Sequence, residues 1–322
     1  MAGKTMNGLR ISGLLFLVCI LILPQTIESK TYTTNEVYRD SSNKSSVEAL
    51  GLGVYLFRWW PGFYVSPFIV GEDGVLAVDP INRDAASLYR QGVAAVTDKP
   101  ITKIIYSHDH RDHIVGADIL SPDAEIISHP LTLESLKRRG DVDIPHPTVL
   151  VNNGDFISIG GRSVGVHYFG PNHGVSNIGL SFNTGIGRML VFVDTIEIGI
   201  VPYRTLPDTN VHGYIASLRA ASELDIDWVL GGHSGPGPAV WIKNYLNYFL
   251  DMEQAIIKAQ STLISEPSNT VEDVIAQTEL FTNSVIEEAV DELRPKYGSW
   301  RGFDAWAPLN AQTVLMYIIT GN

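Results

Sequence analysis

A seven-residue stretch, Ser107-His108-Asp109-His110-Arg111-Asp112-His113, decides the fold of this chain. It follows a run of mostly β-branched residues at 101–106, which predicts a buried strand that ends at the stretch. His108 and His110 are two residues apart, so their side chains point the same way from extended backbone. The last two residues of the stretch fall where a helix is expected to begin. Because imidazole and carboxylate groups are ligands that zinc prefers, the stretch is a candidate metal-binding turn.

The pattern His-x-His-x-Asp-His in this stretch resembles the signature of the metallo-beta-lactamase fold superfamily, and the resemblance extends over roughly Val54 to Ser234. The other positions at which that family places functional residues are occupied in order by Asp79, His173, Asp194 and His233. The last three each follow a predicted strand, so we expect them to converge at one edge of the sheets. The resemblance implies an α/β fold, an αββα sandwich of two packed mixed β-sheets with outer helices.

The resemblance also implies two divalent metal ions, with zinc favoured and iron or manganese compatible. Asp194 would lie between the two ions, and the remaining ligands would be His108, His110 and His173 for one ion and Asp112, His113 and His233 for the other. Asp79 would orient a ligand. His167 is the rival for the third position, but it lies within a predicted strand, and the Gly-Pro-x-His frame favours His173.

Two metals that share a water can lower its pKa toward ~7 and supply hydroxide without a serine or cysteine nucleophile. We therefore expect a hydrolase of an ester, lactone, thioester or amide, in which Asp112 or Asp194 transfers the proton to the leaving group. Asp194 stands where β-lactamase branches usually carry Cys or Ser, and His110 where the flavodiiron branch has Glu, so antibiotic hydrolysis and oxygen reduction are disfavoured. Acyl-homoserine lactonases often carry Tyr where this chain has Glu197.

Two other functions are compatible with the same fold. A mononuclear-iron persulfide dioxygenase can keep the same ligand residues, but its thiol substrates are cytosolic. A non-catalytic metal-binding relative need not keep all seven ligand types, so their retention favours an enzyme. Iron content and oxygen uptake would separate the dioxygenase from a hydrolase.

The N-terminal residues carry the features of a signal peptide. Lys4 and Arg10 precede an uncharged stretch, 11–23, whose length fits a signal-peptide core and is too short to span a membrane. We expect cleavage after Ser29 and a secreted or periplasmic protein without stable membrane insertion. The expected segments are a signal peptide, a polar leader, a metallo-beta-lactamase-like domain and a helical C-terminal extension, at residues 1–29, 30–50, 51–240 and 241–322.

Charge and aromatic content narrow the expected partners. The formal net charge is −12, and so acidic a surface repels phosphate backbones, which argues against nucleic acid as a partner. Aromatic residues crowd the segment before the strand expected at 66–70, and the early hairpin loop of this superfamily often overhangs the metals. We therefore expect Trp59, Trp60 and Phe63 to form an apolar pocket wall for a small apolar or aromatic substrate. A hydrophobic-core role for these aromatics is the alternative.

Overall fold

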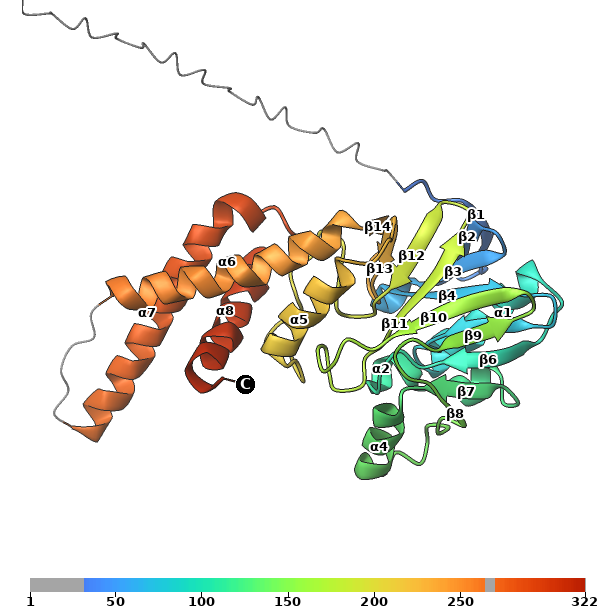
Figure 1. The fold of residues 1–322 in the computed structure, drawn as a ribbon, viewed down its shortest axis with the longest axis horizontal. Coiled ribbons are helices and arrows are strands. Elements are labelled where there is room, and N and C mark those ends of the chain that lie inside the picture. The colour runs from blue at the N-terminus through green and yellow to red at the C-terminus, as the bar shows by residue number, and fades with distance from the viewer. Residues whose placement is uncertain (1–31, 264–269, 322) are drawn as a thin grey trace, which may run out of the picture. The chain divides into compact units, whose positions relative to one another are not determined.

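Two mixed β-sheets pack against each other between outer helices, which confirms the predicted αββα sandwich (Figure 1). The computed structural model describes residues 32–263 and 270–321, and these belong to one compact unit. The expected signal peptide, residues 1–29, lies outside the described residues. None of the helices in the described part of the chain is long and apolar enough to cross a membrane.

The first sheet has eight strands, which pair in chain order from β1 to β8. Their bounds are β1 Glu36–Arg39, β2 Ser45–Gly51, β3 Val54–Trp59, β4 Tyr64–Val70, β5 Val75–Val78, β6 Ile101–Ile105, β7 Glu125–Ser128 and β8 Val149–Leu150. Neighbours are antiparallel from β1 to β5 and parallel from β5 to β8. Every side chain of β5 is buried, as its unbroken apolar sequence requires of a strand covered on both faces.

The segment 30–50 is not the loose leader that its polar composition predicted, because β1 and most of β2 are formed from it. Most side chains of β2 are buried, and its acidic residue has a cross-strand partner. Glu48 accepts hydrogen bonds from Arg58 in β3, with 3.2 Å between Glu48 Oε2 and Arg58 Nη2. A buried strand whose inward side chains include Ser45, Ser46 and Glu48 lacks the apolar alternation that predicts a strand, so its polar composition indicated a loop instead.

Asp40 organises the turn between β1 and β2. Its Oδ1 accepts a hydrogen bond from the backbone N–H of Ser42 at 2.8 Å, and its Oδ2 accepts one from the hydroxyl of Ser45 at 2.9 Å. Burial alone would raise the pKa of Asp40, but these bonds to the ionised form lower it to about 2. The ionised carboxylate therefore stabilises this hairpin at neutral pH.

The second sheet has six strands in the order β14-β13-β12-β11-β10-β9. Their bounds are β9 Phe156–Ile159, β10 Arg162–His167, β11 Gly179–Thr184, β12 Gly187–Val191, β13 Trp228–Leu230 and β14 Gly237–Pro238. The β12–β13 pair is parallel and the other pairs are antiparallel. The inner faces of both sheets meet in one buried cluster, to which Leu56 and Ile69 of the first sheet and Leu180 and Met189 of the second belong.

Helices that connect strands of the first sheet cover its outer face. They are α1 Arg83–Val96, α2 Arg111–Ile114, α3 Ala117–Leu120 and α4 Pro130–Arg139. α1 begins after Asn82, whose Oδ1 accepts a hydrogen bond from the backbone N–H of Ala85 at 3.0 Å. The ring of Tyr89 in α1 stacks on Phe57 of β3, with 4.4 Å between ring centroids, which fixes this helix against the sheet.

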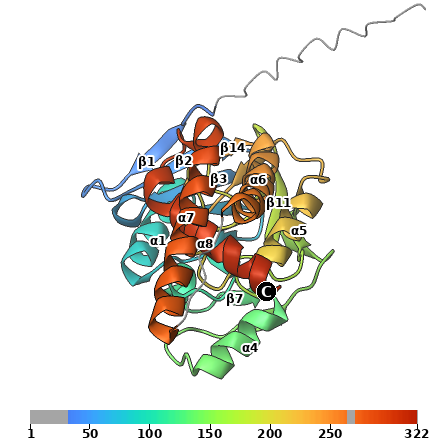
Figure 2. The same cartoon turned by 90° about the vertical axis from the view of Figure 1, so that its left-hand side faces the viewer.

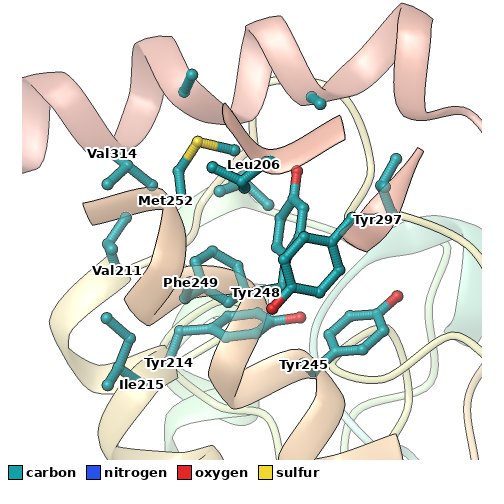
Figure 3. Close-up of a cluster of buried hydrophobic side chains, with 14 of the residues drawn as sticks. Leu206, Val211, Tyr214, Ile215, Tyr245, Tyr248, Phe249, Met252, Tyr297 and Val314 are labelled. Atoms are coloured by element: carbon teal, nitrogen blue, oxygen red, sulfur yellow. The ribbon is translucent and has the colours of Figure 1, made fainter. Parts of the chain in front are cut away.

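The helices of the predicted C-terminal extension pack with α5 over the outer face of the second sheet (Figures 1 and 2). Their bounds are α5 Val211–Ala221, α6 Val240–Thr262, α7 Val271–Tyr297 and α8 Phe303–Thr320. One buried cluster joins them to the sheet, with Leu190 and Val229 from strands and Phe249, Met252 and Val314 from helices (Figure 3). Because this core is continuous, the extension is an integral part of the compact unit.

Candidate metal centre and adjoining cavity

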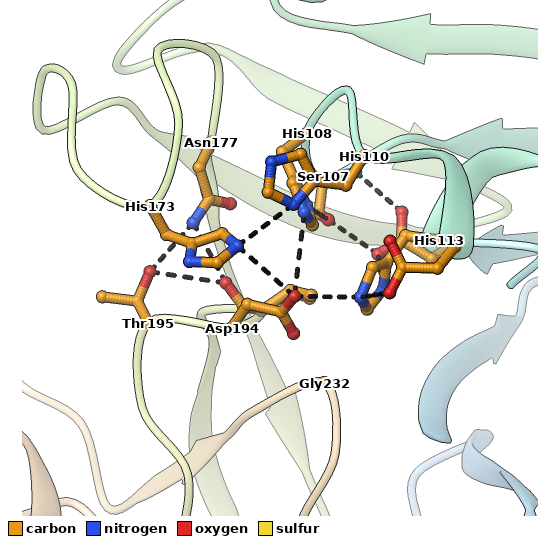
Figure 4. Close-up of polar contacts among 12 residues, drawn as sticks. Ser107, His108, His110, His113, His173, Asn177, Asp194, Thr195 and Gly232 are labelled. Atoms are coloured by element: carbon orange, nitrogen blue, oxygen red, sulfur yellow. Dashed lines mark hydrogen bonds and ion pairs between the residues drawn. The ribbon is translucent and has the colours of Figure 1, made fainter. Parts of the chain in front are cut away.

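The predicted site residues lie on segments that follow strands of both sheets (Figure 4). The quoted stretch follows β6, and its last residues open α2. His173 lies in the loop between β10 and β11, Asp194 follows β12, and His233 follows β13. Strand ends from two sheets thus bring residues from distant parts of the chain to one place.

The seven predicted ligands form two groups that meet at Asp194. Within each group the ligand atoms lie within 4.8 Å of one another, with His108, His110, His173 and Asp194 in the first group and Asp112, His113 and His233 in the second. Asp194 Oδ2 lies 3.5 Å from His173 Nε2 in the first group and 3.0 Å from His113 Nε2 in the second. The carboxylate therefore contacts both groups, as a bridging ligand would.

Three ligand atoms are fully buried and make no hydrogen bond of acceptable geometry with any described residue, namely His108 Nε2, His113 Nε2 and Asp194 Oδ1. His113 Nε2 has the Asp194 carboxylate 3.0 Å away as an ion-pair partner, whereas His108 Nε2 lies 3.8 Å from the same oxygen. A buried polar group without a hydrogen bond costs about 1–3 kcal/mol, and a cation bound here would remove that cost. Imidazole nitrogens and carboxylate oxygens are ligands of divalent transition metals. The residues present therefore fit a metal centre.

Burial and charge set the protonation states of the cluster. Burial lowers the pKa of His108 well below its usual range and that of His173 to about 4, so both imidazoles are neutral at pH 7. Burial would also lower the pKa of His113, but the carboxylate of Asp194 raises it well above its usual value. The same pairing holds the pKa of Asp194 well below its usual range, although burial opposes this. Neutral His108 and His173 and ionised Asp194 are already in the forms that bind metals, whereas His113 would release its proton when a metal binds.

Asp79 acts on two ligand histidines from outside the cluster, on His108 through Ser107 and on His113 directly. Its Oδ2 accepts a hydrogen bond from the Ser107 hydroxyl at 2.6 Å, and Ser107 Oγ lies 2.8 Å from His108 Nδ1. Asp79 Oδ2 also lies 3.6 Å from His113 Nδ1. Both histidines keep Nε2 free for the cluster, which is the arrangement that the predicted orienting role requires.

Asp208 contacts His110 directly, and the sequence analysis did not predict this contact. His110 Nδ1 lies 3.2 Å from His173 Nε2 within the ligand group, whereas its Nε2 lies 3.3 Å from Asp208 Oδ2. Asp208 belongs to a loop without regular structure and has a left-handed φ of +59°. An isolated Asp in an irregular loop carries no sequence signal for this contact.

Asp109, which lies between the first two histidines of the stretch, anchors the turn. Its Oδ1 accepts a hydrogen bond from the Ser176 hydroxyl at 2.6 Å. Its carbonyl oxygen accepts one from Arg139 Nη2 of α4, also at 2.6 Å. The turn is thereby tied both to α4 and to the loop that carries His173.

The backbone around Asp194 is tightly constrained. Asp194 has a left-handed φ of +58°, a conformation that costs a non-glycine residue about 1–2 kcal/mol. A Cβ at Gly232 would lie 2.4 Å from Asp194 Oδ1, so only glycine fits beside this carboxylate. The close approach of the loop after β13 places His233 Nε2 3.3 Å from Asp194 Oδ1.

Glu197 holds the loop that carries His233. Its Oε1 accepts hydrogen bonds from the backbone N–H groups of Gly232 at 2.8 Å and of His233 at 3.0 Å. Burial raises the pKa of the Glu197 carboxyl. A Cβ at Gly231 would lie 2.6 Å from either oxygen of this group, so Gly231 leaves the space that Glu197 occupies. The sequence showed Glu197 only as a departure from the lactonase pattern.

A cavity of 630 Å³ opens beside the ligand groups, a size that suits a small molecule. Five of the ligands lie in its wall, namely His110, Asp112, His173, Asp194 and His233. Most of the remaining wall is apolar or aromatic, and it includes Phe63, Ile200, Val201, Pro202, Tyr203, Leu206, Pro207 and Trp306. The described residues that form the wall include no serine and no cysteine.

Comparison with known protein families agrees with this geometry. The family model described as metallo-beta-lactamase superfamily matches residues 60–233, which is more than half of the chain. The chain belongs to the metallo-beta-lactamase superfamily. The matched region contains all seven predicted ligands.

A curated protein and several solved structures are similar to this chain to different degrees. The curated protein 2,4-dinitroanisole O-demethylase subunit alpha of Nocardioides sp. (strain JS1661) is 30% identical over 266 residues, which are 81% of this chain and 76% of that protein. A metallo-beta-lactamase from Pontibacter korlensis has a TM-score of 0.52 and 12% identity, covering 67% of this chain and 98% of its own. A metallo-beta-lactamase from Erythrobacter litoralis has a TM-score of 0.54 and 19% identity, covering 65% of this chain and 97% of its own. These two structures support the fold alone.

The aromatic wall of this metallo-beta-lactamase superfamily member differs from the prediction. Phe63 lines the cavity and is 69% exposed. Trp59 and Trp60 are not among the described residues that line it, so of the three predicted wall residues only Phe63 lies at the cavity. Trp59 packs on the cluster under α1, and the Trp60 ring lies 5.8 Å from the Arg58 guanidinium. A short 3₁₀ helix, Trp60–Gly62, turns the chain after Trp59 and places Phe63 at its end.

Tyr64, at the start of β4, contacts the ligands instead. Its hydroxyl donates a hydrogen bond to Asp112 Oδ2 at 2.7 Å, and its ring centroid lies 4.3 Å from that of His233. His167, the rejected rival, ends β10 with its Nε2 2.8 Å from Ser181 Oγ. It belongs to neither ligand group, so the geometry agrees with the choice of His173.

Proposed function

We propose that the protein is a metal-dependent hydrolase that cleaves a carbon–oxygen bond in a small aromatic substrate. The observation that carries this proposal is the junction of the His/Asp cluster with a largely apolar cavity whose wall, over the described residues, lacks serine and cysteine. Because such a wall offers no hydroxyl of serine or thiol of cysteine as nucleophile, water is the expected nucleophile. Hydrolysis is therefore the reaction that the site supports best.

The two ligand groups would hold divalent metal ions, with zinc favoured by the donor set and iron or manganese compatible with it. Bound metals would supply Lewis acidity and make water a strong nucleophile at neutral pH. Asp112 and Asp194, two of the carboxylates in the cavity wall, can accept a proton and return it to the leaving group, whereas Glu197 in the same wall is engaged with the backbone of the His233 loop. The Tyr64 hydroxyl, by donating to Asp112 Oδ2, fixes the orientation of that carboxylate.

The similarity to 2,4-dinitroanisole O-demethylase subunit alpha favours an aryl–oxygen substrate. Water can cleave an aryl methyl ether to a phenol and methanol without any oxidant. The exposed ring of Phe63 and the aromatic wall residues Tyr203 and Trp306 fit a flat apolar ring. Hydrolysis of aryl esters and lactones also cleaves a carbon–oxygen bond. Hydrolysis of the thioesters and amides allowed by the sequence cleaves a carbon–sulfur or carbon–nitrogen bond instead.

Metal and product analysis test this proposal. Purified protein should contain about two transition-metal ions per chain, mostly zinc. It should turn over members of a panel of aryl esters, lactones and nitroaryl methyl ethers under argon. In oxygen-18 water, one labelled atom should enter the products. Strict dependence on iron and dioxygen would instead favour the persulfide dioxygenase, and a fully metal-loaded protein inactive on the whole panel would contradict the proposal.

The proposal also includes export. It is based on the basic start and uncharged stretch of residues 1–29. The expected partner is the small substrate, and the net charge of −12 argues against nucleic acid.

A further inference from the structure

The C-terminal extension supplies part of the cavity wall. Arg301, just before α8, and Trp306, in its first turn, line the cavity. Backbone hydrogen bonds hold this segment to the loop after Asp194, from Arg301 N to Gly199 O at 2.9 Å and from Val201 N to Arg301 O at 3.1 Å. Arg301 lies beyond the matched family region, so family membership assigns it no role.

Arg301 brings a positive charge to this wall. It is the only lysine or arginine among the described residues that line the cavity. Across residues 32–263 and 270–321 its guanidinium forms no ion pair, and its one side-chain hydrogen bond is a long one to Ile198 O at 3.4 Å. α8 starts two residues later, and the positive end of its dipole adds to the local potential. Arg301 is exposed and has no ion-pair partner among the described residues, so its guanidinium is available to a ligand with an anionic or acceptor group.

Aromatic side chains in the same wall are available to a ligand. The rings of Tyr203 and Trp306 meet edge to face, with 5.2 Å between centroids. Tyr203 is 56% exposed, and Phe63 is exposed as well. Trp306 also packs against the core and is partly buried, which holds its ring in place, while the exposed rings of Tyr203 and Phe63 can contact a flat aromatic ligand.

We propose that Arg301 binds a planar two-oxygen acceptor, a nitro or a carboxylate group, on the aromatic ring of the substrate. This inference rests on the proposed function and names the substrate class of the same cavity. A guanidinium can donate two parallel hydrogen bonds to such a group. Such a group also withdraws electrons from the ring and thereby stabilises the phenolate that forms when the carbon–oxygen bond breaks. The similar demethylase is named for a substrate whose ring carries nitro groups.

Three probes without a hydrolysable bond test this role. They are 4-nitrobenzyl alcohol, 4-(hydroxymethyl)benzoate and 4-isopropylbenzyl alcohol, which differ only in the group opposite the hydroxymethyl. Their Kd values would be measured by ligand-observed NMR titration of the metal-loaded protein. In Arg301→Gln we expect the Kd of an acceptor-bearing probe to rise about 5- to 10-fold, and that of the isopropyl probe to stay unchanged. Arg301→Lys, which keeps the charge without the planar fork, should give an intermediate Kd.

The matched control is Arg219→Gln, which removes an exposed arginine of α5 that does not line the cavity. It should leave all three Kd values unchanged. If Arg301→Gln raises only the Kd of the carboxylate probe, the ring substituent that Arg301 binds is anionic. If it raises only the Kd of the nitro probe, that substituent is neutral. Equal Kd values for both acceptor probes in wild type and Arg301→Gln, or an equal loss for the isopropyl probe, would overturn the proposal. Arg301-dependent binding without any turnover would retain this subsite and remove the proposed function.

Discussion

Replacement of Asn310 should disturb the cavity from a distance. This fully buried side chain of α8 donates hydrogen bonds to Pro202 O at 3.1 Å and Arg204 O at 2.6 Å, and accepts one from the Tyr248 hydroxyl at 2.8 Å. Asn310→Ala removes all three, and at about 1 kcal/mol each the free energy of unfolding should fall by roughly 3 kcal/mol. For a chain of about 300 residues, this corresponds to a Tm lower by about 5 °C.

The same change should loosen the loop 202–208, which carries Leu206 into the cavity wall and Asp208 to His110. Leu206 and Asp208 both have positive φ angles, so this loop depends on its anchors to stay in place. We expect faster hydrogen exchange over 202–208 and a KM for aryl esters raised about 3- to 10-fold, with kcat nearly kept.

Val314→Ala is the control for this prediction, because Val314 is buried on the same helix and makes no hydrogen bond to the loop. It should lower Tm by a similar amount, since truncation of a buried aliphatic side chain costs a few kcal/mol, about 1–3. Its KM and the exchange of the loop should match those of wild type. The reasoning fails if both variants raise KM alike, or if Asn310→Ala leaves the exchange of 202–208 unaltered.

Three further outcomes are expected. Asp194→Ala should lower hydrolysis by at least ~10²-fold and reduce bound metal in elemental analysis, whereas His167→Ala should change both little; equal losses would mean that the ligands are wrongly placed. The pKa of Asp40, about 2, lies below its ordinary value, so the contribution of its carboxylate to stability is complete above pH 4 and is lost as pH falls toward 2. Asp40→Asn should have a lower free energy of unfolding at pH 7. In chemical denaturation, this variant should also lose less of that free energy than wild type when the pH is lowered. N-terminal sequencing of exported protein should start near Lys30, and a cytosolic pool that begins at Met1 would refute export.

The ligand set could be predicted because the sequence carries the motif residues of the family that it resembles. His108, His110 and His113 lie within one turn, and this dense pattern is the family signature. Asp194 and His233 each follow a short apolar run, in the order in which the family places its later ligands. The assignment of each residue to an ion is what that resemblance implies.

The cavity wall could not be predicted in this way. Which of the aromatics between β3 and β4 faces the site depends on a single turn of 3₁₀ helix, which separates Trp60 from Phe63 by three residues and gives the two rings different surroundings. Arg301 reaches the cavity, and Asn310 reaches the loop 202–208, only because the C-terminal helices share a core with the second sheet. Their contacts join residues about a hundred positions apart, and no local pattern records them.

The division of the cavity between two regions has a consequence for how such an enzyme can diversify. The ligands lie at strand ends within the matched family region, whereas Arg301 and Trp306 lie outside it. Single substitutions at Arg301 or Trp306 can therefore alter the molecules that the cavity accepts while the ligand residues, and the Asn310 anchor of the loop 202–208, stay as they are. In this architecture, selectivity and metal binding can change separately.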